Sequence, residues 1–119
     1  MIIGQTMFSV RRSTEHRAES ALDEIAGLLD EAHGMRGYRI FRSIGMSPLA
    51  SDLCDEGREA ALCDAHYVIQ TQWDSVDDHD AFYAGEGLRR IYMSLASIFA
   101  TGPYEILYES LADREGITV

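Results

Sequence analysis

Positive charge is scarce in this sequence of 119 residues. Ten arginines and no lysine stand against 20 aspartates and glutamates, which gives a formal net charge of −10 at pH 7. Nucleic acids and anionic membrane surfaces bind positively charged proteins, so this shortage excludes both as partners. A small neutral or phenolic molecule stays open as a ligand, because the lining of a pocket need not share the charge of the surface.

Long apolar segments are also lacking. No apolar run approaches the roughly 20 residues that span a bilayer. The N-terminal segment MIIGQTMFSVRR has its apolar residues before its basic pair, which is the reverse of a secretory signal. We therefore expect a cytoplasmic protein that does not enter a membrane.

Cysteine and the common catalytic motifs are equally sparse. Cys54 and Cys63 are farther apart than the two to four residues of a zinc-binding pair. Outside a secretory context they predict reduced thiols and not a disulfide. His16, His33 and His66 show no ligand spacing with each other or with a cysteine. No nucleophile motif, phosphate-binding loop or dinucleotide fingerprint is present, so we expect no metal and no cofactor.

Alternating strand and helix patterns fill most of the chain. Apolar and β-branched segments predict four strands, and apolar residues at helical spacing predict two helices, the second interrupted at 84–87. The expected strands are 2–10, 37–44, 66–73 and 104–111, and the expected helical segments are 14–32, 75–83 and 88–100, with Gly102-Pro103 ending the last helix.

The order β-α-β-β-α-β is the ferredoxin-like arrangement, an α+β fold. Its helices cover one face of a four-stranded antiparallel sheet. We assign residues 1–112 to one domain with an inserted loop at 45–65, and residues 113–119 to a polar C-terminal tail.

The second face of this sheet requires a cover. Both sides of the first strand carry apolar residues, with Ile3 and Met7 on one side and Phe8 and Val10 on the other. A sheet face exposed to water would be polar. The simplest cover is a second copy of the same sheet related by a two-fold axis, so we predict a homodimer with its sheets face to face.

These features together resemble the antibiotic biosynthesis monooxygenase (ABM) domain family, whose members are dimeric α/β-barrels. The resemblance covers roughly residues 2–110 and depends on marks in a fixed order: Gly37-Tyr38, a third strand that ends in Gln-Trp-Asp-Ser, Phe82-Tyr83, Leu88-Arg89-Arg90 and Gly102-Pro103. It implies a cofactor-independent monooxygenase that oxidises a phenolic or quinol-type small molecule with O2. The same fold hosts many activities, so a dimeric binding or structural protein without the catalytic set is the alternative.

The resemblance also points to site residues. Trp73 matches a Trp that the polyketide oxygenases of the family link to catalysis. Ile69 stands where those enzymes place an Asn, and His79 stands where they place a Tyr. Their Arg position falls near Met93 or Tyr92, with Arg89 and Arg90 one turn earlier. The residues of the haem-degrading relatives are not retained, so the resemblance implies no haem.

These positions predict a set of roles. His79 is the candidate proton acceptor for a phenol, since neutral imidazole accepts protons near pH 7. Trp73 would stack on a flat aromatic substrate, and Tyr92 with Arg89 or Arg90 would stabilise an anionic oxygen. The substrate-binding set is completed by Ile69, Phe82 and Tyr83.

Two structural interpretations stay open beside these roles. Trp73 is equally suited to packing between helix and sheet with its indole N–H hydrogen-bonded. His79 is equally suited to a solvated helix surface, because Asp77, Asp78 and Asp80 would favour its charged form.

Overall fold

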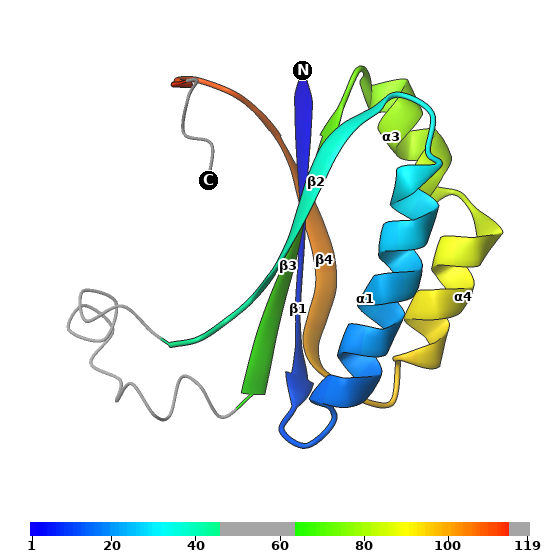
Figure 1. Cartoon of the computed structure of the whole chain (residues 1–119), viewed down its shortest axis with the longest axis vertical. Coiled ribbons are helices and arrows are strands. Elements are labelled where there is room, and N and C mark those ends of the chain that lie inside the picture. The colour runs from blue at the N-terminus through cyan, green and yellow to red at the C-terminus, as the bar shows by residue number, and fades with distance from the viewer. Residues whose placement is uncertain (46–63, 115–119) are drawn as a thin grey trace.

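The computed structural model describes residues 1–45 and 64–114, which form one sheet and one layer of helices (Figure 1). The elements in chain order are β1 (Ile2–Arg11), α1 (Glu15–Asp30), β2 (Met35–Arg42), β3 (Asp64–Trp73), α3 (Val76–Tyr83), α4 (Glu86–Ser94) and β4 (Phe99–Glu109). The predicted loop 45–65 lies almost wholly outside the described residues, as do 115–119 of the predicted tail.

The sheet has the strand order β2-β3-β1-β4, and all neighbouring strands are antiparallel. All three helices lie on the same side of it in Figure 1. The predicted α+β, ferredoxin-like fold with a four-stranded antiparallel sheet is therefore confirmed. The central strand β1 joins the edge strand β4 to β3, so residues from the two ends of the chain become neighbours.

Sequence periodicity explains the core between the two layers. In α1 the buried residues recur at helical spacing: Ala18, Ala21, Leu22, Ile25 and Leu29. In β3 every second residue is buried: Ala65, Tyr67, Ile69, Thr71 and Trp73. The sheet-facing side of α1 and the helix-facing side of β3 thus carry most of the apolar side chains that hold the layers together.

The last helix and strand differ from the sequence prediction. Helix α4 ends at Ser94 and not near residue 100, and β4 already begins at Phe99, which pairs with Val10. Ile98 is buried in the turn that follows α4, so an apolar residue at this position does not show that the helix continues. Gly102, predicted to end the helix, lies inside β4 with φ +75 at a register shift between Met7 and Ser9.

The face of the sheet away from the helices is rich in apolar side chains. Phe41 is paired with Val68, and Val68 and Tyr104 are both paired with Met7, so these side chains form one row across the sheet. Ile106 and Tyr108 continue the same face along β4, and Phe41, Tyr104, Ile106 and Tyr108 are all more than 40% exposed. No helix among the described residues is long and apolar enough to cross a membrane.

Candidate functional site

A serine cap directs α3 over the end of β3. Ser75 follows the strand closely, and its Oγ accepts a hydrogen bond of 3.1 Å from the backbone N–H of Asp78, as a capping residue does. The predicted helix start at Ser75 is thereby confirmed. Because the connection is so short, the first turns of α3 lie against the helix-facing side of the sheet, where His79 is only 5% exposed.

His79 is buried among aromatic rings. Its ring meets Trp73 edge-on at a centroid distance of 5.8 Å and stacks on Tyr83 at 4.5 Å. The solvated position considered for His79 is therefore not the one that the structure shows.

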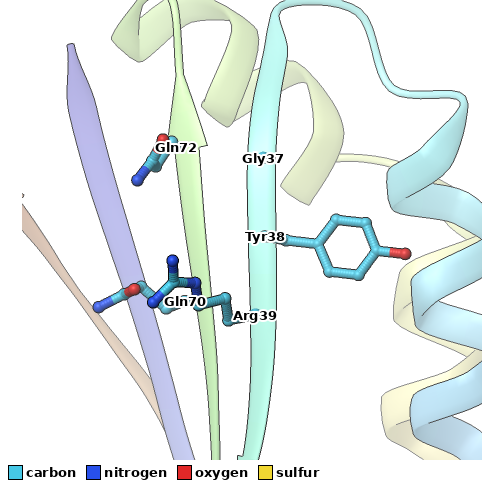
Figure 2. Close-up of a pocket in the computed structure, with 5 residues that line it drawn as sticks. All are labelled: Gly37, Tyr38, Arg39, Gln70 and Gln72. Atoms are coloured by element: carbon cyan, nitrogen blue, oxygen red, sulfur yellow. The ribbon is translucent and has the colours of Figure 1, made fainter. Parts of the chain in front are cut away.

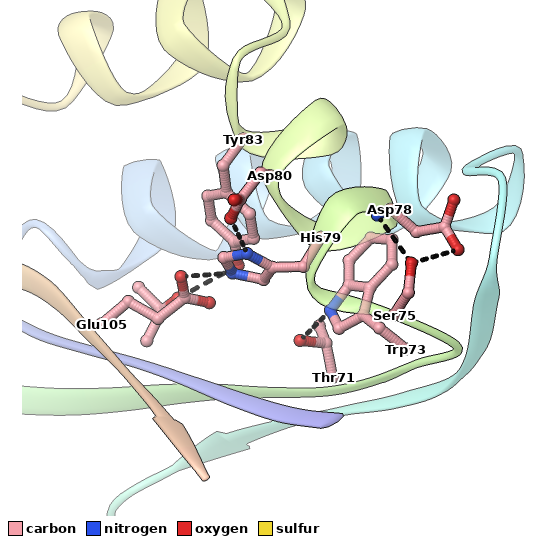
Figure 3. Close-up of polar contacts among 9 residues, drawn as sticks. Thr71, Trp73, Ser75, Asp78, His79, Asp80, Tyr83 and Glu105 are labelled. Carbon is pink, nitrogen blue, oxygen red and sulfur yellow. Dashed lines mark hydrogen bonds and ion pairs between the residues drawn. The ribbon is translucent and has the colours of Figure 1, made fainter. Parts of the chain in front are cut away.

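Each ring nitrogen of His79 faces a carboxylate (Figure 3). Nε2 lies 2.6 Å from Oε1 of Glu105 on β4, and Nδ1 lies 2.9 Å from Oδ1 of Asp80 on α3. An ionised carboxylate only accepts hydrogen bonds, so both contacts are satisfied when each ring nitrogen carries a hydrogen. Of the two carboxylates, that of Glu105 is largely buried and that of Asp80 is exposed.

The second oxygen of Glu105 lies among hydroxyl groups. Oε2 accepts a hydrogen bond of 3.3 Å from Thr6 Oγ1, which lies 3.2 Å from the hydroxyl of Tyr83. Gly4 makes room for the carboxylate, because a Cβ at this position would lie 2.8 Å from Glu105 Oε2. We call Thr6, His79, Tyr83, Tyr92 and Glu105 the buried polar cluster.

The two tyrosines of the cluster are held in their neutral form. Burial raises the pKa of Tyr83 above its usual value, although the hydrogen bond with Thr6 works in the opposite direction. Burial, together with the nearby charge of Glu105, raises the pKa of Tyr92 to about 12. The Tyr92 hydroxyl is buried and has no hydrogen-bond partner among residues 1–45 and 64–114. It is therefore an unused donor beside the Glu105 carboxylate.

Trp73 forms one wall of the cluster. It is fully buried, and its Nε1 donates a hydrogen bond of 2.7 Å to Thr71 Oγ1. Phe82 packs against the indole at a centroid distance of 5.4 Å. The indole thus has the hydrogen-bonded packing role considered for it, and it also contacts the ring of His79.

The structure brings together most of the predicted site residues, but not all of them. Trp73, His79, Phe82 and Tyr83 are in ring contact, Tyr92 lies near Glu105, and Ile69 is buried on β3 opposite Thr6. Arg89 and Arg90 are both exposed on α4, outside the buried cluster. Glu105, which the sequence analysis did not select, is the central acid of the cluster.

Two open cavities lie away from this cluster. The hollow in Figure 2, of about 160 Å³, is lined by residues of β2 and β3; there Arg39 and Gln70 point to the side opposite Tyr38, away from the helices. A larger one, of about 390 Å³, lies between α1 and β2, where Glu19 accepts hydrogen bonds of 2.8 Å from both Arg42 and Tyr67. These bonds lower the pKa of the Glu19 carboxyl. Neither cavity contains an acid–base pair comparable to that of His79 and Glu105.

No group of three or more His, Cys, Asp or Glu side chains is arranged to hold a metal ion in the part of the chain that the structure describes. The side chains of His79, Asp80 and Glu105 are engaged with one another.

Comparison with known proteins gives matches to solved structures alone. No family model and no curated protein matches the sequence. A provisionally named antibiotic biosynthesis monooxygenase from Deinococcus radiodurans is similar with a TM-score of 0.71 and 16% identity, over 100% of both chains. A second one, from Nitrosomonas europaea, has a TM-score of 0.70 and 13% identity, over 94% of this chain and 100% of its own.

A third structure carries a more specific name. SnoaB, described as a cofactor-independent oxygenase from Streptomyces nogalater, is similar with a TM-score of 0.65 and 12% identity, over 96% of both chains. At such identities the similarity establishes a shared fold and does not transfer an activity.

Proposed function

We propose that this chain, which has the fold of the antibiotic biosynthesis monooxygenases, is an oxygenase that acts without a cofactor and oxidises a phenolic or quinol-type small molecule with O2. The observation that carries the proposal is the buried pair of His79 and Glu105, held at 2.6 Å among aromatic rings and hydroxyl groups. The fold of SnoaB supports it, because that protein is named a cofactor-independent oxygenase.

The buried pair is more useful for chemistry than for stability. Removing two charges from water costs several kcal/mol per ion, and a packed apolar pair is often at least as stable. Titratable groups in such surroundings are therefore candidates for acid–base catalysis. Here the pair would take the hydroxyl proton of a phenol, leaving an electron-rich phenolate that reacts with O2.

The surrounding side chains suit a flat aromatic molecule. Phe82 and Tyr83, which are only partly buried, offer ring surfaces for stacking beside the buried Trp73, and the Tyr92 hydroxyl is a donor for an oxygen of the substrate. Arg89 and Arg90 are exposed on α4, where either would attract an anionic oxygen of the substrate.

A non-enzymatic binding or structural protein is the second candidate function. It is favoured by the pairing within the cluster, where the side chains of Thr6, His79, Tyr83 and Glu105 satisfy one another. Ile69, which stands at the amide position of the oxygenases, favours it as well, because an apolar side chain cannot hydrogen-bond a substrate.

Oxygen uptake separates the two functions. We expect the wild-type protein to consume O2 with members of a panel of anthrones and hydroquinones, and to do so without added metal or flavin. Asp77→Asn, which removes an exposed acid of α3 outside the cluster, is the control that should keep the wild-type rate. An uptake no faster than that of substrate in buffer, for every member of the panel, would support the binding or structural protein.

We further propose that two copies associate through the apolar faces of their sheets, as the resemblance implies. The exposed Phe41, Tyr104 and Ile106 support this, because a patch of this kind marks an interaction surface. Ile106→Lys should give a monomer in light scattering. Val76→Lys, at a similarly exposed residue on α3, should leave the assembly unchanged. A monomeric wild-type protein at micromolar concentration would contradict the proposal.

A further inference from the structure

We infer that Glu105 is the catalytic base of this site, and that His79 is a positioning residue which holds the Glu105 carboxylate in place. The inference rests on the proposed oxygenase function and assigns the proton transfer within it. It reverses the roles that the sequence suggests, in which His79 takes the proton.

The hydrogen bonds of His79 leave it no free nitrogen. Nε2 is occupied by Glu105 at 2.6 Å and Nδ1 by Asp80 at 2.9 Å. A base needs a lone pair directed at the proton it removes, within hydrogen-bond reach. With both nitrogens donating to carboxylates, the His79 ring has none to offer to a substrate.

Glu105 meets the requirement that His79 does not. Its Oε1 is fixed by the imidazole, while its Oε2 has one long hydrogen bond, of 3.3 Å, from Thr6. A carboxylate oxygen has capacity for a second donor. Thr6, which donates that bond, also contacts the hydroxyl of Tyr83 on α3. Tyr92 on α4 is near enough for the charge of Glu105 to raise the Tyr92 pKa, and its hydroxyl has no hydrogen-bond partner among the described residues. A substrate hydroxyl placed here would meet a lone pair and a donor together.

Asp80 completes the arrangement from the solvent side. Its side chain is 64% exposed, whereas those of His79 and Glu105 are 7% and 17% exposed. By accepting the Nδ1 hydrogen, it fixes the orientation of the ring and keeps Nε2–H directed at Glu105. An orienting carboxylate of this kind acts through the imidazole and need not change its own protonation.

Glu105 is the only side chain that carries a proton in the proposed oxidation. The O–H bond of the phenol breaks, and its proton goes to Glu105 Oε2. The phenolate gives one electron to O2, and recombination forms a C–O bond and a peroxide anion, which takes the proton back from Glu105. The O–O bond then breaks, and hydroxide leaves with the hydrogen of the same carbon as water. A carbonyl is left on that carbon, and Glu105 is again ionised.

Steady-state kinetics with O2 and a hydroquinone test this assignment. Glu105→Gln keeps the shape of the side chain but has no basic oxygen, so kcat should fall at least 100-fold while KM stays within about threefold. His79→Gln keeps an N–H for Glu105 and should retain kcat within about tenfold. His79→Ala, which offers Glu105 Oε1 no donor, should lose more activity than His79→Gln, because a positioning role depends on that hydrogen bond.

Glu105→Asp keeps the carboxylate but withdraws it by one methylene. It should be slow yet still lose its remaining activity in acid, whereas Glu105→Gln should have no such acidic limb. A Glu105→Gln enzyme within threefold of the wild-type kcat would overturn the assignment. Equal losses in Glu105→Gln and His79→Gln would overturn it too, since His79 would then be as essential as Glu105.

The failures of the two proposals are distinguishable. No oxidation by the wild-type protein refutes the oxygenase function, and the role of Glu105 in it falls at the same time. Oxidation by the wild type with an active Glu105→Gln variant refutes the role of Glu105 alone. Trp73 fluorescence, which reports on a fully buried indole beside the cluster, verifies that each variant is folded.

Discussion

Replacing both members of the His79–Glu105 pair with apolar residues should restore the stability that is lost when only one is replaced. Glu105→Leu leaves the Nε2–H of His79 without an acceptor, and His79→Phe leaves the Glu105 carboxylate without its imidazole. The exposed fractions of these side chains are 7% for His79 and 17% for Glu105, so water cannot fully replace the missing partner.

The magnitude follows from the cost of an unpaired buried charge. Removing one partner of a buried pair destabilises by about 3–5 kcal/mol, and the partial exposure of Glu105 places the expected loss near the lower end, about 3 kcal/mol for each single variant. The double variant leaves no charge to desolvate and should lie within about 1 kcal/mol of the wild type. The coupling free energy between the two sites is then about 5 kcal/mol.

Urea unfolding measured by Trp73 fluorescence gives the four free energies of this cycle. Trp73 is the only tryptophan and touches His79, so its emission follows the loss of packing at this place. All four proteins are compared at one protein concentration, because any self-association adds to the apparent stability. Single-variant losses that simply add in the double variant, within about 0.5 kcal/mol, would refute the buried ion pair.

Three further predictions concern neighbouring positions. Gly4→Ala should lower the free energy of unfolding by about 1–3 kcal/mol, because the new Cβ displaces Glu105; Gly27→Ala in α1, with nothing within 4 Å, should instead be stabilising in the same urea assay. The folded protein favours neutral Tyr92, whose pKa is raised to about 12. The stability that depends on this neutral form is fully present below the unfolded pKa of 10.0 and is lost as pH rises toward about 12. Between these values Tyr92→Phe should remove a slope of about 1.4 kcal/mol per pH unit, measured by urea midpoints. Trp73→Ala should cost about 3–5 kcal/mol in unfolding followed by circular dichroism, since the indole is fully buried.

The fold could be predicted from the sequence because the spacing of apolar residues in its helices and strands is clear. The buried face of α1 recurs at helical spacing and β3 alternates strictly, so local pattern and final structure agree. The end of α4 could not be predicted in the same way. Ile98 and Phe99 are apolar residues that suit a helix or a strand, and only the pairing of Phe99 with Val10 decides between them.

Only those site residues that lie close together in the sequence could be predicted. Trp73 and His79 lie six positions apart on a strand and the helix that follows it, and Ser75 between them marks the start of that helix. Glu105 faces Thr6 through the pairing of two strands from opposite ends of the chain. Register of this kind is set by tertiary packing, so no local pattern could connect Glu105 with His79.

The pairing of β1 with β4 also governs when the acid–base pair comes into being during synthesis. A ribosome releases β1, α1, β2, β3, α3 and α4 before β4, and these can begin to pack while β1 still has one open edge. Until β4 emerges, His79 has no Glu105 and Thr6 faces no carboxylate. The growing chain therefore has the aromatic residues of the site but lacks its proposed base, Glu105, which is added only with the strand that completes the sheet.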